Sequence, residues 1–189
     1  MKFLIAGLGN IGNEYANTRH NIGFDILDAF AERHQLRFHS DRLGDVCEMK
    51  FKGKILILVK PSTYMNLSGK ALKYWLTKEK IPVEHSLTLV DDLAFPLDTL
   101  KIKKSGSDAG HNGLKSIHEN LGTTEYPRLR FGIGNHFEKH KQVDFVLGKW
   151  EANEIEMVQK KIMVCCDIIE SFVTIGLERT MNQFNHKKF

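Results

Sequence analysis

Two hydrophobic patterns alternate along the chain. Short apolar runs, which are typical of buried strands, occupy residues 2–8, 46–51, 54–59, 86–90, 100–104 and 128–133. Between them, apolar residues recur every three or four positions, as on one face of a helix. These segments run from Thr18 to about His34, around Leu72 up to Pro82, from Gly113 to about Leu121, and from about Glu151 to Gly176. The alternation predicts an α/β fold in which helices cover both faces of a sheet.

Turn and cap residues sharpen this prediction. Thr18 is a residue type that caps helices, and Gly176 is one that ends them. Lys52-Gly53 joins two strands as a hairpin turn. Asp91 and Asp92 directly follow a strand, and in such folds functional sites form where strands end in loops. The loops are therefore the segments in which functional side chains are expected.

Composition narrows the class of protein. A chain of 189 residues with 42% hydrophobic and 26% charged residues has the size and core of one globular domain. No segment has the roughly 20 apolar residues that span a bilayer, and the N-terminal apolar run is too short for a secretory signal. Three cysteines without metal-binding spacing suit reduced thiols, so we expect a cytoplasmic protein with no membrane partner. The net charge of +4 permits an anionic partner.

The first loop matches a nucleotide-binding pattern. Gly7-Leu8-Gly9-Asn10-Ile11-Gly12 has the form G-x-G-x-x-G after a strand, and Asp41, after a further strand at 36–40, is placed like a ribose-binding acid. In a dinucleotide fold, however, the helix begins inside the glycine motif. Residues 13–17 are poor helix formers. A dinucleotide-dependent oxidoreductase is therefore kept only as an alternative.

Other common motifs are incomplete. Ser68-Gly69-Lys70-Ala71 lacks both the upstream glycine and the final Ser or Thr of a phosphate-binding loop, and there is no G-x-S-x-G serine motif. His136 and His140 have helical spacing, but Glu138 is misplaced for a zinc motif and the segment is rich in lysine. The sequence predicts two solvated histidines there and no metal site.

Three loops combine amide side chains with glycine and with histidine or methionine. They are Asn10 with Asn17-Thr18-Arg19-His20-Asn21, then Tyr64-Met65-Asn66-Leu67-Ser68-Gly69, then Gly110-His111-Asn112-Gly113. Each alone is an ordinary turn or cap sequence. Together they suit hydrolysis: a neutral His20 takes a proton from water, Asp91 stabilises the imidazolium, and the amides of Asn66 and Asn112 donate to an oxyanion. Such a site needs neither a metal nor a nucleophilic serine.

Five segments carry longer motifs in a fixed order. They are Gly7-Leu8-Gly9-Asn10 with Glu14-Tyr15, Thr18-Arg19-His20-Asn21-Ile22-Gly23, Met65-Asn66-Leu67-Ser68-Gly69-Lys70, Gly110-His111-Asn112-Gly113-Leu114-Lys115, and Arg128-Leu129-Arg130-Phe131-Gly132-Ile133-Gly134. The order continues through Phe145-Val146-Leu147-Gly148-Lys149 and covers nearly the whole chain. In these motifs the chain resembles bacterial peptidyl-tRNA hydrolases.

The resemblance implies a single domain over residues 1–189, a three-layer α/β/α sandwich with a mixed, mostly parallel central sheet. It also implies a monomeric, cofactor-free enzyme that cleaves the ester between a peptide and the 3′ ribose of tRNA, and so recycles peptidyl-tRNA released from ribosomes. By matching motifs, His20 is the general base, Asp91 its supporting carboxylate, and Asn10 the residue that tells a peptide amide from a free amino group. The resemblance also implies that the following residues contact the substrate or the tRNA: Tyr15, Asn21, Tyr64, Met65, Asn66, His111 and Asn112.

Basic residues near the second glycine loop favour an RNA partner. Lys101 and Lys103 point to one face of their strand, as do Arg128 and Arg130 on another. We expect Lys103 and Arg130 to contact phosphates of the tRNA acceptor stem and 3′ end, with Lys104, His111 and Lys115 nearby. Unpaired 3′ bases can stack on the two tyrosines of the first and second loops, Tyr15 and Tyr64.

Three positions depart from the family pattern. Ile11 replaces a usual proline, Ala94 replaces a usual acidic residue, and residues 105–109 contain fewer glycines. None removes an expected catalytic group. A non-catalytic RNA-binding relative is the second alternative, and the joint presence of His20 and Asp91 argues against it, because a binding module needs no base.

Overall fold

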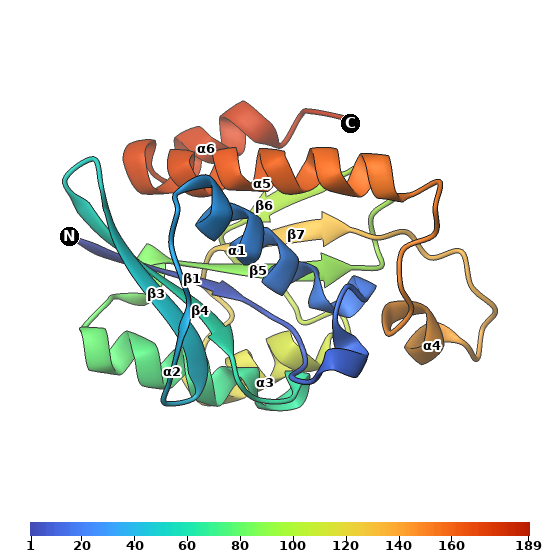
Figure 1. The fold of residues 1–189 in the computed structure, drawn as a ribbon, viewed down its shortest axis with the longest axis horizontal. Helices are drawn as coiled ribbons and strands as arrows, with labels where there is room; N and C mark the ends of the chain where they lie inside the picture. The colour runs from blue at the N-terminus through green and yellow to red at the C-terminus, as the bar shows by residue number, and fades with distance from the viewer.

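A computed structural model describes all 189 residues, and its centre is one sheet in the order β2-β3-β4-β1-β5-β7-β6 (Figure 1). The strands are β1 (Lys2–Gly7), β2 (His39–Asp41), β3 (Gly44–Phe51), β4 (Lys54–Pro61), β5 (Ser86–Asp92), β6 (Leu100–Lys103) and β7 (Arg128–Gly132). β1 pairs in parallel with β4 and β5, and β5 with β7. The β2–β3, β3–β4 and β6–β7 pairs at the two edges are antiparallel. The predicted mixed sheet is confirmed, and its parallel part is formed by the four central strands.

Helices cover both faces of this sheet, as predicted. They are α1 (Ile22–Arg33), α2 (Ser68–Glu79), α3 (Asn112–Leu121), α4 (Gln142–Val146), α5 (Ile155–Ile175) and α6 (Leu177–Phe184), with 3-10 turns η1 (Asn13–Tyr15), η2 (Arg19–Asn21), η3 (Met65–Leu67) and η4 (Val83–His85). Figure 1 shows α1, α5 and α6 on one face and α2 and α3 on the other. None of these helices is both long and apolar enough to cross a bilayer.

The central strands bury side chains on both faces. On β1, Phe3 and Ile5 belong to the core under α1 and α5, whereas Leu4 and Ala6 belong to the core over α2 and α3. A strand that is covered on both sides has no polar face, so its sequence is an unbroken apolar run. This is why the central strands could be recognised as compact apolar segments.

The glycines of the first motif serve the packing of β1 against α1. A Cβ atom on Gly7 would lie 2.2 Å from the carbonyl oxygen of Gly23, and one on Gly23 would lie 2.4 Å from the backbone nitrogen of Leu8. The two backbones therefore touch because neither residue carries a side chain. α1 starts at Ile22, well after the motif, and not inside it as in a dinucleotide fold. The feature on which a dinucleotide site depends is missing.

The helices differ from the prediction at two boundaries and by two additional short helices. Thr18 does not cap α1, because its hydroxyl donates to the carbonyl of Tyr15 at 2.7 Å and η2 intervenes before the helix. The last long helix begins at Ile155 instead of near Glu151, and Gly176, with φ of 85°, ends it as predicted. Two short helices escaped prediction: α4, which buries no residue, and α6.

The end of the chain covers the outer edge of β6. The side-chain oxygen of Asn185 accepts the backbone N–H of Ile102 at 2.7 Å, and its side-chain nitrogen donates to the carbonyl of Ile102 at 3.0 Å. One asparagine thus supplies hydrogen bonds that a neighbouring strand would otherwise provide.

Candidate active site

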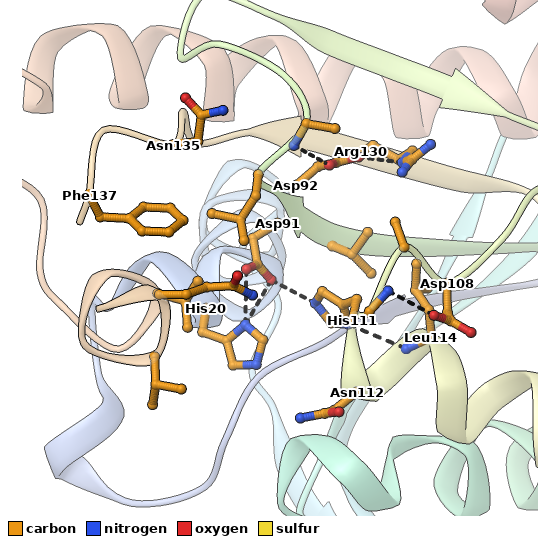
Figure 2. Close-up of a pocket in the computed structure, with 18 residues that line it drawn as sticks. His20, Asp91, Asp92, Asp108, His111, Asn112, Leu114, Arg130, Asn135 and Phe137 are labelled. Carbon is orange, nitrogen blue, oxygen red and sulfur yellow. Dashed lines mark hydrogen bonds and ion pairs between the residues drawn. The ribbon is translucent and has the colours of Figure 1, made fainter. Parts of the chain in front are cut away.

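The ends of parallel strands gather the polar side chains. β1 and β5 lie side by side, so the loop after β1 and the acidic residues at the end of β5 meet at the same edge of the sheet. Asp91 is the penultimate residue of β5 and is 4% exposed. His20 comes from η2, and His111 immediately precedes α3. Figure 2 shows both rings pointing toward the Asp91 carboxylate.

Asp91 joins the two histidines. Nδ1 of His20 lies 2.9 Å from Oδ2 and 3.1 Å from Oδ1 of Asp91, while Nε2 of His111 lies 2.9 Å from Oδ1 (Figure 2). The sequence paired His20 with Asp91, and the structure brings them together. It assigned His111 to substrate or phosphate contacts, whereas in the structure this ring is hydrogen-bonded to Asp91.

The hydrogen bonds fix the proton positions on His111. Its Nδ1 accepts the backbone N–H groups of Gly113 and Leu114, at 3.1 and 3.3 Å, and so caps α3. An accepting nitrogen carries no proton, so the proton is on Nε2, which donates to Asp91. Both ring nitrogens of His111 are therefore occupied. His20 differs, because its Nδ1 donates to Asp91 and its Nε2 has no partner within the protein.

Burial and charge oppose one another in this group. Burial lowers the pKa of His20, but the charge of Asp91 and its hydrogen bond outweigh burial, and the pKa stays above the ordinary value of 6.5. Burial likewise raises the pKa of Asp91, and the two histidines outweigh it, so that this pKa falls well below its usual range. Asp91 is therefore charged near neutral pH and can stabilise an imidazolium on His20.

His20, Asp91 and His111 also have ligand atoms within 4.8 Å of one another, as a metal site would require. The nitrogens that face Asp91 are already hydrogen-bonded to it, and Nδ1 of His111 is used at the start of α3. These atoms are therefore already used in hydrogen bonds, and the cluster is better suited to proton transfer than to metal binding. The other histidines considered, His136 and His140, are exposed in the loop before α4.

A cavity of about 430 Å³ opens beside the two histidines. Its polar lining includes the predicted residues His20, Asp91, His111, Asn112 and Arg130. Its apolar lining includes Phe137 and two residues of α4, Val143 and Val146, none of which the sequence assigned to the site. Figure 2 shows Phe137 and Arg130 on either side of Asp91 in this view. The spacing of the two valines, three residues apart, was the available signal for a short helix with one apolar face.

The first and second loops are tied together by amide groups. Asn10 and Asn21 exchange two hydrogen bonds of 2.9 Å between backbone and side chain. The side-chain oxygen of Asn10 also accepts the backbone N–H of Met65 at 2.7 Å. Asn10 and Asn21 line a second, smaller cavity of about 300 Å³ and do not line the larger one. Asn66 is exposed beside Met65 and, like Asn112, makes no side-chain hydrogen bond within the protein.

The two predicted stacking residues are neighbours. The rings of Tyr15 and Tyr64 meet edge to face with centroids 6.5 Å apart, and Tyr64 is 52% exposed. They lie on the loops that Asn10 and Met65 join, so an aromatic surface adjoins the amide cluster.

The two basic residues predicted to contact phosphates differ in whether they form an ion pair within the protein. Lys103, at the end of edge strand β6, has no ion-pair partner within the protein. Arg130 lines the larger cavity and forms an ion pair with Asp92, whose other oxygen accepts the backbone N–H of Ala94 at 2.8 Å. Ala94 therefore supports the end of β5 through its backbone, although it lacks the acidic side chain usual at that position.

Arg128 was expected on the exposed basic face, and this prediction was wrong. The side chain is 1% exposed, stacks on Tyr126 at 3.9 Å, and donates to the carbonyls of Gly106 and Thr124 at 3.1 and 2.6 Å. Arg128 and Arg130 do point to the same face of the sheet, as expected. The loop formed by residues 105–109, however, folds over Arg128. Its guanidinium anchors the loop that leads to His111.

Comparison with known proteins gives consistent matches. The family model described as peptidyl-tRNA hydrolase matches residues 4–189. A peptidyl-tRNA hydrolase of Phocaeicola vulgatus is 56% identical over 187 residues, covering 99% of this chain and 100% of the relative. That of Porphyromonas gingivalis is 52% identical over 185 residues, covering 98% and 100%. The crystal structure of peptidyl-tRNA hydrolase from Acinetobacter baumannii superposes with a TM-score of 0.92 at 32% identity, covering 98% of this chain and 95% of that one.

Proposed function

The chain belongs to the peptidyl-tRNA hydrolase family, and on that premise we propose that it cleaves the ester between a peptide and the 3′ ribose of tRNA, using His20 as the general base. One observation supports His20 as the base: its Nε2 has no hydrogen-bond partner within the protein, whereas both ring nitrogens of His111 are hydrogen-bonded. Two histidines share the same carboxylate, and only one of them has a nitrogen with which to accept a proton.

The proposed chemistry begins with a water molecule at Nε2 of His20. The water gives a proton to this nitrogen as its oxygen attacks the ester carbonyl, and the resulting imidazolium is stabilised by the charge on Asp91. The carbonyl oxygen becomes negative and receives hydrogen bonds from neutral amide donors, for which the unpaired side chains of Asn66 and Asn112 are suited. When the intermediate collapses, the imidazolium returns its proton to the departing ribose oxygen.

The proposed substrate site has two parts. The apolar side of the larger cavity, with Phe137, Val143 and Val146, suits the peptide. The acceptor stem and 3′ end of the tRNA are proposed to contact Lys103 and Arg130 and to stack on Tyr15 and Tyr64, whose rings adjoin the amide cluster. Asn10 is proposed to tell a peptide amide from a free amino group, and Asn21, Met65 and His111 to hold this arrangement in place.

We further propose that one copy of the chain, folded as a single domain, suffices for activity, because every group invoked in the chemistry comes from the same chain. Free, buried Cys47, Cys165 and Cys166 are compatible with a reducing compartment, and the cytoplasm is also where the proposed substrate is produced.

The decisive experiment compares two substrates on the same tRNA, one with an N-acetylated amino acid and one with a free α-amino group. Release of the acetylated residue, with the free aminoacyl-tRNA spared, is the expected result. A protein that binds both and cleaves neither would instead be an RNA-binding relative. Thermal stabilisation by NADH without ester cleavage would favour the oxidoreductase alternative, which the comparisons do not support.

A further inference from the structure

α4 forms part of the cavity wall but has little support of its own. It is five residues long, buries none of them, and stands apart from the sheet in Figure 1. Val143 is 65% exposed, yet this residue and Val146 line the cavity beside the two histidines. Something outside α4 must therefore fix its position.

The side chain that reaches α4 is Arg19, the residue before His20. Arg19 is 5% exposed, and its Nη1 donates to the carbonyl of Phe145 at 3.2 Å. Its guanidinium also lies over the Phe145 ring, 4.2 Å from the centroid, and 5.3 Å from the centroid of Trp150. A single guanidinium thus holds both the backbone and the side chain of α4.

The backbone around Arg19 holds the segment that follows α4. The N–H of Arg19 donates to the carbonyl of Gly148 at 3.0 Å, and Thr18 forms an isolated antiparallel bridge with Lys149. A Cβ atom at Gly148 would lie 3.1 Å from Nη1 of Arg19, so a side chain there would require the guanidinium to shift. The turn that carries His20 and the segment that follows α4 are therefore joined side by side.

An acidic side chain completes the arrangement. Nη2 of Arg19 donates to Oε2 of Glu154 at 2.7 Å, and the same oxygen accepts the backbone N–H of Glu151 at 2.8 Å. The side chains of the pair are 5% and 18% exposed, so water screens it far less than a surface pair. Lysine could keep the charge at this position, but it lacks the planar fork that binds a carbonyl and a carboxylate while stacking on a ring.

We infer that Arg19 is a positioning residue that holds the α4 wall against the cavity, and that it serves binding of the peptide part of the substrate instead of proton transfer. The inference rests on the proposed function for its substrate. The wall that Arg19 supports is apolar, and peptide side chains are the part of peptidyl-tRNA that gains from contact with apolar residues. His20 itself is held by Asp91, independently of α4.

The test compares Arg19→Lys with Arg33→Lys. Arg33 is a matched control, because it also forms ion pairs, with Asp167 and Glu170, but at the C-terminal end of α1, away from the end next to His20. The substrates are one tRNA carrying either an apolar tripeptide or a single N-acetylated residue. For Arg19→Lys we expect KM for the tripeptide substrate to rise roughly tenfold, as when one apolar group is removed from a binding pocket, with kcat and the pH profile retained. KM for the single-residue substrate should change much less, and Arg33→Lys should change neither.

A second measurement needs no substrate. Amide hydrogen exchange of residues 142–150 should accelerate in Arg19→Lys and in Glu154→Gln, while exchange in α1 stays as in the parent protein. Equal loss of kcat on both substrates, or unchanged exchange in these residues, would overturn the inference. A parent protein that hydrolyses neither substrate would instead overturn the proposed function, so the two failures are distinguishable.

Discussion

The side-chain oxygen of Asn10 accepts a hydrogen bond of 2.7 Å from the backbone N–H of Met65. This bond identifies the accepting end of the carboxamide, because a side-chain NH2 group could not accept it. The NH2 group is consequently the end that remains for a ligand. The main-chain groups of Asn10 are also used, in the exchange with Asn21.

The Asn10→Asp variant changes that free end alone. Aspartate keeps the oxygen that accepts from Met65 but replaces the NH2 donor with a charged oxygen, which attracts the α-ammonium of an unblocked aminoacyl-tRNA. We expect the ratio of kcat/KM for acetylated over free aminoacyl-tRNA to fall by roughly tenfold or more. Thermal unfolding of the variant checks that the fold is kept. An unchanged ratio would remove Asn10 from substrate discrimination.

Replacing His20 with alanine should abolish general-base assistance. Because such assistance contributes roughly 10²–10⁴ in rate, we expect a single-turnover rate lower by about that factor, with tRNA affinity retained. Filter binding of uncharged tRNA measures the affinity separately. Near-normal hydrolysis by His20→Ala would defeat the assignment of the base.

The pH dependence follows from the pKa of His20. The base must be neutral, so the rate falls as pH decreases through the pKa, which Asp91 holds above the ordinary 6.5. In Asp91→Asn the charge is gone and burial remains, so the pKa of His20 drops below its ordinary value and the acid limb of the kcat/KM profile moves to lower pH. The plateau rate should fall as well, since the imidazolium loses its counter-charge. A profile that keeps its midpoint in Asp91→Asn would contradict the pairing.

Phosphate binding is best tested at Lys103, because its charge has no partner in the protein, whereas Arg130 is paired with Asp92. We expect Lys103→Ala to weaken tRNA binding and to flatten the slope of log K against log salt by about 0.7 to 0.9 for each phosphate that is no longer neutralised. Lys160→Ala, an exposed lysine on α5 at the opposite face, is the matched control and should leave the slope unchanged. An equal slope in both variants would place the tRNA elsewhere.

Arg128 should matter for stability and not for tRNA affinity. Arg128→Met removes the donor that satisfies the carbonyls of Gly106 and Thr124, and we expect unfolding free energy to fall by about 2–4 kcal/mol in urea titrations. Lys101→Met, on the neighbouring strand and partly exposed, should change stability by no more than about 0.5 kcal/mol. A variant at Arg128 as stable as the Lys101 control would show that the 105–109 loop does not depend on the guanidinium.

The fold was largely predictable because its signals are local. Strands such as β1 are buried on both faces and therefore read as apolar runs, and the turn at Lys52-Gly53 joins β3 to β4 as expected. Thr18 shows where local sequence signals fail. Its hydroxyl donates to the carbonyl of Tyr15, and α1 has no side-chain cap. A residue type that favours caps does not reveal which nearby backbone group it will bind.

The sequence paired His20 with Asp91, which the structure brings together, but it did not predict the other contacts around the candidate site. Periodicity placed Arg128 and Arg130 on one face of β7, but it could not show that a loop more than twenty residues earlier folds over the first of them. Likewise, the second hydrogen bond of Asp91 comes from His111, whose role depends on the point at which α3 begins. Such contacts between segments distant in sequence are set by the assembled fold.

The amide of Asn185 against Ile102 has a practical consequence for handling the protein. β6 is the last strand on its side of the sheet, and its outer backbone groups would otherwise be open to pairing with another molecule. We expect a truncation before Asn185, or a tag that displaces α6, to expose that edge and to promote self-association. The residue that pairs with this strand edge therefore lies in the C-terminal segment and not in a neighbouring strand.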